Sequence, residues 1–319
     1  NDVSENKNKI REISLVLFLF SYICTKFRKN FCAVYQLCAR TQSAIIQNIK
    51  DVLEHKTQKT NQKRIRKGET IMVNVGIIGA GRIGQVHMNS ILTRVPNAKI
   101  KAVADPFLSE EADKKAKAAG AEYTTKDYKD ILADKDIDAV IICSSTDTHS
   151  PISIEAIKAG KHVFCEKPID HDVDKIKEVI KTLEGTGLKY QVGFNRRFDH
   201  NFEAAQRAVV NGKIGAPHII KITSRDPEPP SAEYVKVSGG MFLDMTIHDF
   251  DMVRFLAGCD AEEVYVQAAN LGDPEIGKAG DVDTAIITLK MENGALAVID
   301  NSRQAVYGYD QRAEVFGSK

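Results

Sequence analysis

The stretch VNVGIIGAGRIGQVH occupies residues 73–87 and joins an apolar strand pattern to a glycine-rich turn. Its first six residues are mostly β-branched and apolar, which is typical of a buried parallel strand. Gly79, Gly81 and Gly84 follow with the spacing G-x-G-x-x-G. In that pattern the first glycine permits a tight turn, the second lets a pyrophosphate approach the backbone, and the third lets a helix pack closely. We therefore predict a dinucleotide site here, with Arg82 and Ile83 at the N-terminus of the following helix.

A second apolar run, residues 100–104, ends in Asp105, about twenty residues beyond the glycines. A carboxylate at this place binds the hydroxyls of an adenosine ribose and repels a 2′-phosphate. The pattern thus favours NAD over NADP, although Arg82 beside the turn would tolerate an extra phosphate. An ordinary strand-turn-helix with a helix-capping Asp is the plainer interpretation, but the surrounding strand and helix patterns disfavour it.

Composition is that of a globular protein, with 43% hydrophobic and 27% charged residues among 319. The net charge of +1 hides an asymmetry, because residues 1–71 carry 14 basic and 6 acidic side chains. Residues 72–319 are acidic, which disfavours a nucleic-acid partner. Cys143, Cys165 and Cys259 lie in apolar runs without C-x-x-C spacing, as in reduced cytoplasmic proteins. No His/Cys set has metal-site spacing, so we predict no metal.

Residues 1–71 differ from the rest of the chain and are rich in Asn, Lys, Ile and Phe. Their one apolar run, residues 13–24, is too short for a confident membrane span and lacks a clean signal-peptide cleavage site. We interpret the segment as a non-native or disordered leader, with Met72 as the true start. A membrane anchor or a targeting segment is the alternative.

From Met72 to Phe194 strand-like and helix-like runs alternate, which predicts a doubly wound parallel sheet with ligands at the strand ends. Polar residues 144–149 follow the strand expected at 137–143, and we expect Pro151 to open the next helix. Glu166, Lys167 and Pro168 follow the strand expected at 162–165. We therefore assign residues 72–194 to an NAD-binding Rossmann domain.

Residues 195–319 have a different rhythm, which predicts an α+β domain with a largely antiparallel open sheet. A glycine pair, Gly239-Gly240, precedes an expected helix over residues 241–256, and strand-like runs follow. The chain stops at Lys319 on a strand-like run, so we interpret this substrate-binding domain as truncated.

Three side chains are candidates for acid-base chemistry. Asp244 and His248 stand four residues apart on the expected helix and so share a face, and a His beside a carboxylate is a suitable base near neutral pH. A helix-stabilising pair on a solvated face is the plainer interpretation, because such spacings are common. Lys167 follows a strand at the edge where a nicotinamide would lie. Pro168 restricts the backbone of Lys167, and a surface ion pair with Glu166 is the alternative.

In combination these motifs resemble the Gfo/Idh/MocA family of NAD(P)-dependent sugar and polyol oxidoreductases. The matching stretches are GIIGAGRIG, CSSTDTH, HVFCEKP, QVGFNRRFD and GGMFLDMTIHDFDMVRFLAG, which together span most of residues 72–319. SRDP at residues 224–227 and YGYDQR at residues 307–312 are most similar to the inositol 2-dehydrogenase branch of the family.

This resemblance implies NAD-dependent oxidation of myo-inositol at C2 to scyllo-inosose. It implies that Lys167, Asp244 and His248 are catalytic, with His248 taking the hydroxyl proton. It assigns the cofactor to Ser144, Thr146, His149, Glu166 and Lys167, in addition to the glycine turn and Asp105. It places Arg197, Asp226, Asp251 and Tyr307 near the substrate. It also implies a cytoplasmic homotetramer whose partner is a small polyol and not a membrane.

Several alternatives remain open from the sequence. Within the family, a dehydrogenase for scyllo-inositol, glucose or another polyol is the nearest rival. A non-catalytic NAD-binding sensor has the same fold, but it need not keep an acid-base set. An inactive fragment is the third interpretation, because the family continues beyond the equivalent of Lys319.

Overall fold

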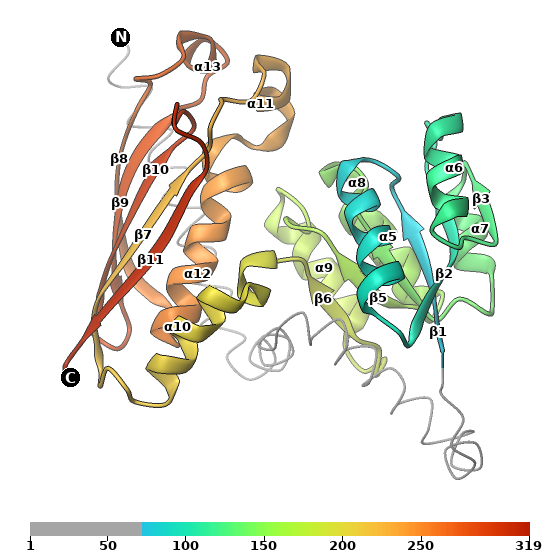
Figure 1. Cartoon of the computed structure of the whole chain (residues 1–319), viewed down its shortest axis with the longest axis horizontal. Coiled ribbons are helices and arrows are strands. Elements are labelled where there is room, and N and C mark those ends of the chain that lie inside the picture. Colours follow the sequence, from blue (N-terminus) through green and yellow to red (C-terminus); the bar gives the residue numbers. More distant parts are fainter. Residues whose placement is uncertain (1–71) are drawn as a thin grey trace. The chain divides into compact units, whose positions relative to one another are not determined.

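The computed structural model describes residues 72–319. They divide into two compact units, residues 72–194 and residues 195–319, each with its own sheet and core. Figure 1 shows the helices and strands of each unit. The predicted leader, residues 1–71, lies outside the described residues, so its interpretation stays a prediction.

The first unit is a doubly wound sheet of six parallel strands in the order β3-β2-β1-β4-β5-β6. Its strands are β1 (Val73–Ile78), β2 (Ala98–Ala104), β3 (Tyr123–Thr125), β4 (Ala139–Ile142), β5 (His162–Cys165) and β6 (Tyr190–Val192). The helices between them are α5 (Arg82–Arg94), α6 (Glu110–Ala118), α7 (Tyr128–Ala133), α8 (Thr146–Lys158) and α9 (Val173–Leu183). This order confirms the predicted Rossmann architecture, in which ligands bind where the strand order reverses, between β1 and β4.

Short polar side chains cap the N-termini of three helices in this unit. Ser109, Asp127 and Asp172 each accept a hydrogen bond from a backbone N–H in the first turn of α6, α7 and α9. One boundary prediction was wrong, because α8 begins at Thr146 and Pro151 lies inside it. Pro151 costs α8 a single backbone hydrogen bond, so the helix tolerates it. Thr146 and His149 are consequently helical, whereas we expected them in a loop.

The second unit contains a five-stranded sheet in the order β11-β7-β10-β9-β8. Its strands are β7 (Pro217–Arg225), β8 (Ala261–Ala269), β9 (Thr284–Met291), β10 (Leu296–Ser302) and β11 (Asp310–Gly317). Its helical elements are η2 (Asn195–Phe198), α10 (His200–Val210), α11 (Ala232–Ser238), η3 (Phe242–Thr246), α12 (Ile247–Ala257) and α13 (Pro274–Lys278). The sheet is largely antiparallel, as predicted, with one parallel pair, β7 and β10.

The core of this unit lies between the sheet and α12. Ile220, Ile299 and Ile287 line the inner face of three neighbouring strands, and Met252 and Leu256 of α12 are buried in the same cluster. The predicted single helix over residues 241–256 was wrong in its first turn, because residues 242–246 form the π-helix η3. π-turns inside helices are frequent at functional sites. Among residues 72–319, no helix is both long enough and apolar enough to span a membrane.

Candidate functional site

The turn after β1 contains three glycines, and at two of them a side chain would collide with neighbouring backbone. Gly79 has a φ of +104°, and a Cβ there would lie 2.5 Å from the carbonyl oxygen of Cys143, which follows β4. A Cβ on Gly84 would lie 2.0 Å from the carbonyl oxygen of Gly79. Gly81 differs, because no atom lies within 4 Å of the place where its Cβ would be. Gly79 and Gly84 thus make the turn and the packing of α5 possible, while Gly81 leaves open space beside the backbone.

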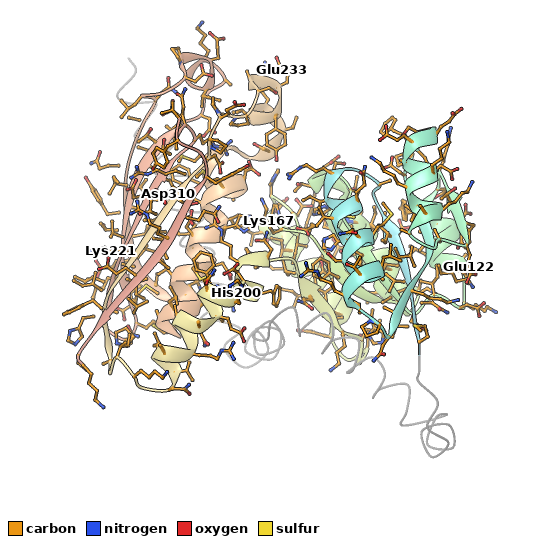
Figure 2. All side chains as sticks on the ribbon, in the orientation of Figure 1. Glu122, Lys167, His200, Lys221, Glu233 and Asp310 are labelled. Carbon is orange, nitrogen blue, oxygen red and sulfur yellow. The ribbon has the colours of Figure 1, made fainter. Side chains whose placement is uncertain are left out.

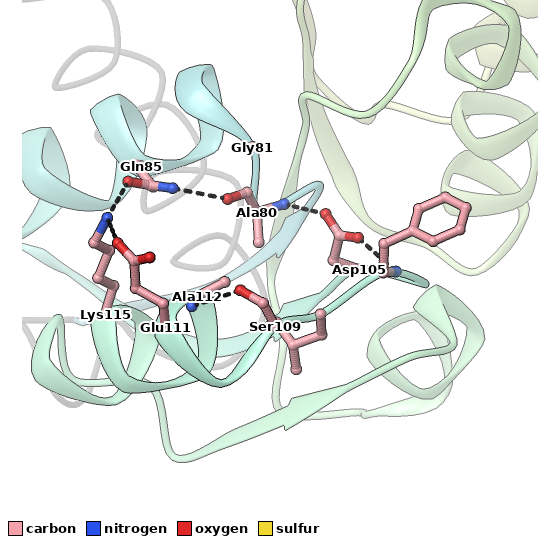
Figure 3. A pocket seen from close by; sticks show the side chains of 10 residues that line it. Ala80, Gly81, Gln85, Asp105, Ser109, Glu111, Ala112 and Lys115 are labelled. Atoms are coloured by element: carbon pink, nitrogen blue, oxygen red, sulfur yellow. Dashed lines mark hydrogen bonds and ion pairs between the residues drawn. The ribbon is translucent and has the colours of Figure 1, made fainter.

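Asp105 lies at the end of β2 and faces this turn. Its Oδ2 accepts a hydrogen bond from the N–H of Ala80 at 2.8 Å, and its Oδ1 accepts one from Phe107 at 2.8 Å. Both bonds fix the carboxylate in the lining of a cavity of about 310 Å³ (Figure 3). Another part of the cavity is lined by Gln85, Glu111 and Lys115. There the Lys115 ammonium lies 3.1 Å from Oε1 of Gln85 and 2.6 Å from Oε1 of Glu111.

These features fit a dinucleotide. No side chain caps the N-terminus of α5, so its N–H groups are suited to bind phosphate. The space beside Gly81 would admit a pyrophosphate, and the carboxylate of Asp105 would accept from ribose hydroxyls. Arg82 is exposed and Ile83 is half-buried at the start of α5. Their contact with the cofactor, like that of the other predicted residues, stays a prediction.

The segment after β4 is tied to the one after β5 by a histidine. His149 is buried, and its Nδ1 lies 2.8 Å from the carbonyl oxygen of Pro168 while its Nε2 lies 3.0 Å from that of Ser144. The hydroxyl of Ser144 bonds to that of Thr148 at 2.6 Å. Because its ring is buried between two backbone carbonyls, His149 holds the segments that follow β4 and β5 together.

Glu166 and Lys167 follow β5, and the Lys167–Pro168 peptide bond is cis. The Glu166 carboxylate pairs with Nε2 of His87 at 2.7 Å, and both side chains are largely buried. The His87 ring also packs edge-on against Phe164, with ring centroids 5.1 Å apart. Sequence reasoning missed His87, whose one signal was its place at the end of the glycine-rich stretch. The pair fastens α5 to the segment that carries Lys167.

In the second unit Asp244 belongs to η3, and His248 lies in the first turn of α12. The two oxygens of Asp244 have donors from two other elements. The Tyr234 hydroxyl of α11 donates to Oδ1 at 3.1 Å, and Nη2 of Arg303, which follows β10, contacts Oδ2 at 3.3 Å. Neither Tyr234 nor Arg303 was predicted from the sequence, because each belongs to a different element from Asp244 and no local pattern links them.

Two buried ion pairs fasten η2 to α12. Arg197 donates to both oxygens of Asp251 at 2.7 and 2.8 Å, and its guanidinium lies over the ring of Phe255. Arg197 and Asp251 were predicted near the substrate, and the structure shows that they contact each other. Their contact with substrate stays a prediction, beside this structural role.

The second pair joins Arg196 to Asp249, whose other oxygen accepts from Nδ2 of Asn301 at 2.9 Å. Burial raises the pKa of Asp249, against the opposing charge of Arg196 and the hydrogen bond from Asn301. Asn301 in turn accepts from the Thr246 hydroxyl at 2.6 Å, so one polar network connects η2, η3, α12 and β10.

The other two predicted substrate residues lie outside the strands, Asp226 directly after β7 and Tyr307 in the turn between β10 and β11. Asp226 directly follows β7, and its backbone bonds to Ser302 and Ala305. Tyr307 is exposed. Its hydroxyl donates a hydrogen bond to Asp310 at 2.9 Å and accepts one from Arg225 at 3.3 Å. The structure therefore brings Tyr307 together with charged residues of β7 and β11.

Comparison with known proteins gives two family models. The model described as "Oxidoreductase family, NAD-binding Rossmann fold" matches residues 73–194, and "GFO/IDH/MocA C-terminal domain" matches residues 202–319. These matches confirm two predictions from the sequence: that the chain is an oxidoreductase and that its cofactor is NAD. In residues 72–319 no group of His, Cys, Asp and Glu side chains could hold a metal ion.

Individual relatives align over most of the described residues. The "Uncharacterized oxidoreductase YrbE" of Bacillus subtilis is 53% identical, covering 78% of this chain and 73% of that protein. The "Myo-inositol 2-dehydrogenase" of Thermotoga maritima is 50% identical, covering 77% and 73%. A solved structure of scyllo-inositol dehydrogenase from Lactobacillus casei, described with bound NAD(H) and scyllo-inositol, is 35% identical with a TM-score of 0.72, covering 78% and 74%.

Proposed function

The chain belongs to the Gfo/Idh/MocA oxidoreductase family, and on that premise we propose that it oxidises myo-inositol at C2 with NAD as the hydride acceptor. One observation supports this most strongly. Asp244 belongs to η3 and His248 to the first turn of α12 in the second unit, and Lys167 follows the carboxyl end of the parallel strand β5 in the first unit. The 50% identity to a myo-inositol 2-dehydrogenase supports the choice of substrate.

In this proposal the three side chains have separate roles. His248 accepts the proton of the reacting hydroxyl as general base. Lys167 donates a hydrogen bond to the same hydroxyl and thereby favours loss of its proton. Asp244 supplies a negative charge that stabilises the protonated form of His248. Bound NAD would supply the hydride acceptor. Arg197, Asp226, Asp251 and Tyr307 are proposed to shape the polyol site. An analogue that lacks a hydroxyl would lose its hydrogen bond to the site and bind less well.

The first test is NAD⁺ reduction by the purified chain with myo-inositol, followed by absorbance. His248→Asn and Lys167→Met should each lower kcat by about 10²–10⁴-fold, the usual contribution of a general base or acid. Both variants should still bind NADH. His200→Asn is the matched control, because His200 is an exposed residue at the start of α10 (Figure 2), and its kcat should not change.

Epimers separate the remaining candidates. Turnover of scyllo-inositol in preference to myo-inositol would favour the second candidate, which the 35% identical Lactobacillus casei enzyme supports. A folded chain that binds NADH but oxidises no inositol, glucose or other polyol would contradict catalysis and favour an NAD-binding sensor.

We also propose a cytoplasmic homo-oligomer, of tetramer size by family resemblance. The three cysteines among residues 72–319 are free thiols, as is usual in the cytoplasm. The strand register places five exposed apolar side chains on one face of the second sheet, opposite to α12; these are Ile219, Tyr265, Ile286, Leu296 and Phe316. An apolar face of this kind is typical of an interface between subunits. Light scattering in solution tests the proposal, and a monomer would contradict it.

A further inference from the structure

A buried guanidinium contacts Asp244, and the proposed mechanism gives it no role. Arg303 directly follows β10, its backbone N–H donates to the carbonyl of Asp283 at 2.8 Å, and its side chain is 1% exposed. Its Nη2 lies 3.3 Å from Oδ2 of Asp244. A charged guanidinium is rarely buried unless an opposite charge compensates it, so Arg303 and Asp244 compensate each other.

The geometry of this pair differs from that of the ion pair between Arg197 and Asp251. That pair is bidentate, and both its members are buried, which is the arrangement expected of a stabilising contact. The contact of Arg303 with Asp244 is longer and single, and the Asp244 side chain is 22% exposed. Nε of Arg303 is buried and has no hydrogen-bond partner within residues 72–319. The fold thus keeps a buried cation beside Asp244 without satisfying it fully.

Tyr234 completes the arrangement from the other side. Its hydroxyl donates to Oδ1 of Asp244, so each carboxylate oxygen has a donor from a different element. A carboxylate held at both oxygens has a fixed rotamer, and the Arg303 guanidinium places a compensating positive charge beside it. These are the two properties that Asp244 needs in order to orient and charge-balance His248.

We propose that Arg303 is a positioning residue, which acts on the reaction through Asp244 and does not touch the substrate. Tyr234 assists it by holding the second oxygen. This inference rests on the proposed function, since it assigns Arg303 a part in the chemistry of Asp244 and His248.

The test is a double-mutant cycle in the full chain with Arg303→Gln and Asp244→Asn. Arg303→Gln should lower kcat by roughly 30-fold while changing the KM for NAD⁺ less than twofold, and Arg303→Lys should recover much of the loss. In the Asp244→Asn background, Arg303→Gln should lower kcat by less than about threefold. The reason is that the losses in kcat from two residues that act as one unit do not multiply. Losses that multiply would overturn the proposal.

Two further measurements keep the outcome decisive. Arg254→Gln is the matched control, because Arg254 lies in α12 and pairs with Asp260, and its kcat should stay within about twofold of the wild type. If Arg303→Gln does not fold, Tyr234→Phe replaces it in the cycle and should likewise have no added effect with Asp244→Asn.

Failure of the proposed function has a different signature. If the wild-type chain oxidises no polyol, the urea midpoints of the same four proteins decide whether Arg303 acts through Asp244. A midpoint shift of the double variant that is clearly smaller than the sum of the two single-variant shifts supports the contact. A shift equal to that sum overturns it.

Discussion

In residues 72–194 the candidate site is built mainly from backbone, whereas in residues 195–319 it is built from side chains. The glycine turn after β1 works through N–H groups and through the absence of side chains, and its parts lie within six residues. Asp244 depends instead on the side chains of Tyr234 in α11 and Arg303 after β10. A site built from backbone should lose binding when a side chain is added to it. A site built from side chains should lose binding or stability when one of them is removed.

The largest effect is expected where the second unit depends on a buried charge. Arg197→Met leaves the Asp251 carboxylate buried without its bidentate partner, which should lower the free energy of unfolding by about 3–5 kcal/mol. Urea unfolding measures this loss. Replacing both residues, Arg197→Met with Asp251→Leu, should recover most of it, and a loss below about 1 kcal/mol for the single variant would contradict a structural role.

Glycine substitutions test the backbone site of the first unit. Gly84→Ala should weaken NADH binding at least 100-fold, about 2.7 kcal/mol, because its Cβ would collide with the carbonyl of Gly79. It should also lower the thermal midpoint. Gly81→Ala is the matched variant, since its Cβ meets no protein atom. It should weaken NADH binding while the thermal midpoint stays unchanged, and a midpoint that fell equally in both variants would contradict this distinction.

Acid should weaken the second unit through Asp283. Burial alone would raise the pKa of this carboxyl, but N–H groups of Leu271, Gly272 and Asp273 outweigh burial and hold the pKa below its ordinary value of 3.8. The unfolded chain therefore binds the proton first, so this stabilisation is complete above about pH 5 and disappears as the pH falls through the lowered pKa.

Asp283→Asn tests that sign. It should cost about 2 kcal/mol of unfolding free energy near neutral pH and much less in strong acid, where the wild type has lost the same bonds. Urea midpoints at both pH values measure it. An equal loss of unfolding free energy at the two pH values would show that the charge of Asp283 does not stabilise the loop at residues 271–273.

The smallest effect is expected at Asp105, the carboxylate that we predict to bind the ribose. Asp105→Ser should weaken NADH binding about tenfold, near 1.4 kcal/mol, and narrow the preference for NADH over NADPH. Fluorescence titration with both cofactors measures the ratio. Glu111→Gln, at the other part of the same cavity, is the control and should keep the preference.

The parts of the fold that were predictable are those set by local pattern. Gly79, Gly81 and Gly84 have a fixed spacing, and Asp105 ends the next strand, so one window of sequence contains the dinucleotide turn and its acid. The helix boundary at residue 146 was not predictable in this way. Pro151 is a strong local signal for a helix start, but the preceding residues continue the helix and His149 anchors its first turn to Pro168.

The candidate residues of the second unit could be named from the sequence, but the side chains that surround them could not. Asp244 and His248 stand out by their spacing, whereas Tyr234 and Arg303 have no sequence relation to Asp244, and the π-turn at residues 242–246 has no pattern of its own. The pairing of Arg197 with Asp251 joins residues 54 positions apart. Such contacts arise from how β7, β10 and α12 pack.

The sequence by itself determined the doubly wound Rossmann architecture, the glycine turn and the class of cofactor, and it supplied the candidates Lys167, Asp244 and His248, because strand periodicity and residue spacing are local properties of the chain. Tertiary structure alone decided which charges are buried together: Arg196 with Asp249, Arg197 with Asp251, His87 with Glu166, and Arg303 with Asp244. The physical reason is that the stability of a buried charge depends on the partner that folding brings to it, and the chain order does not specify that partner.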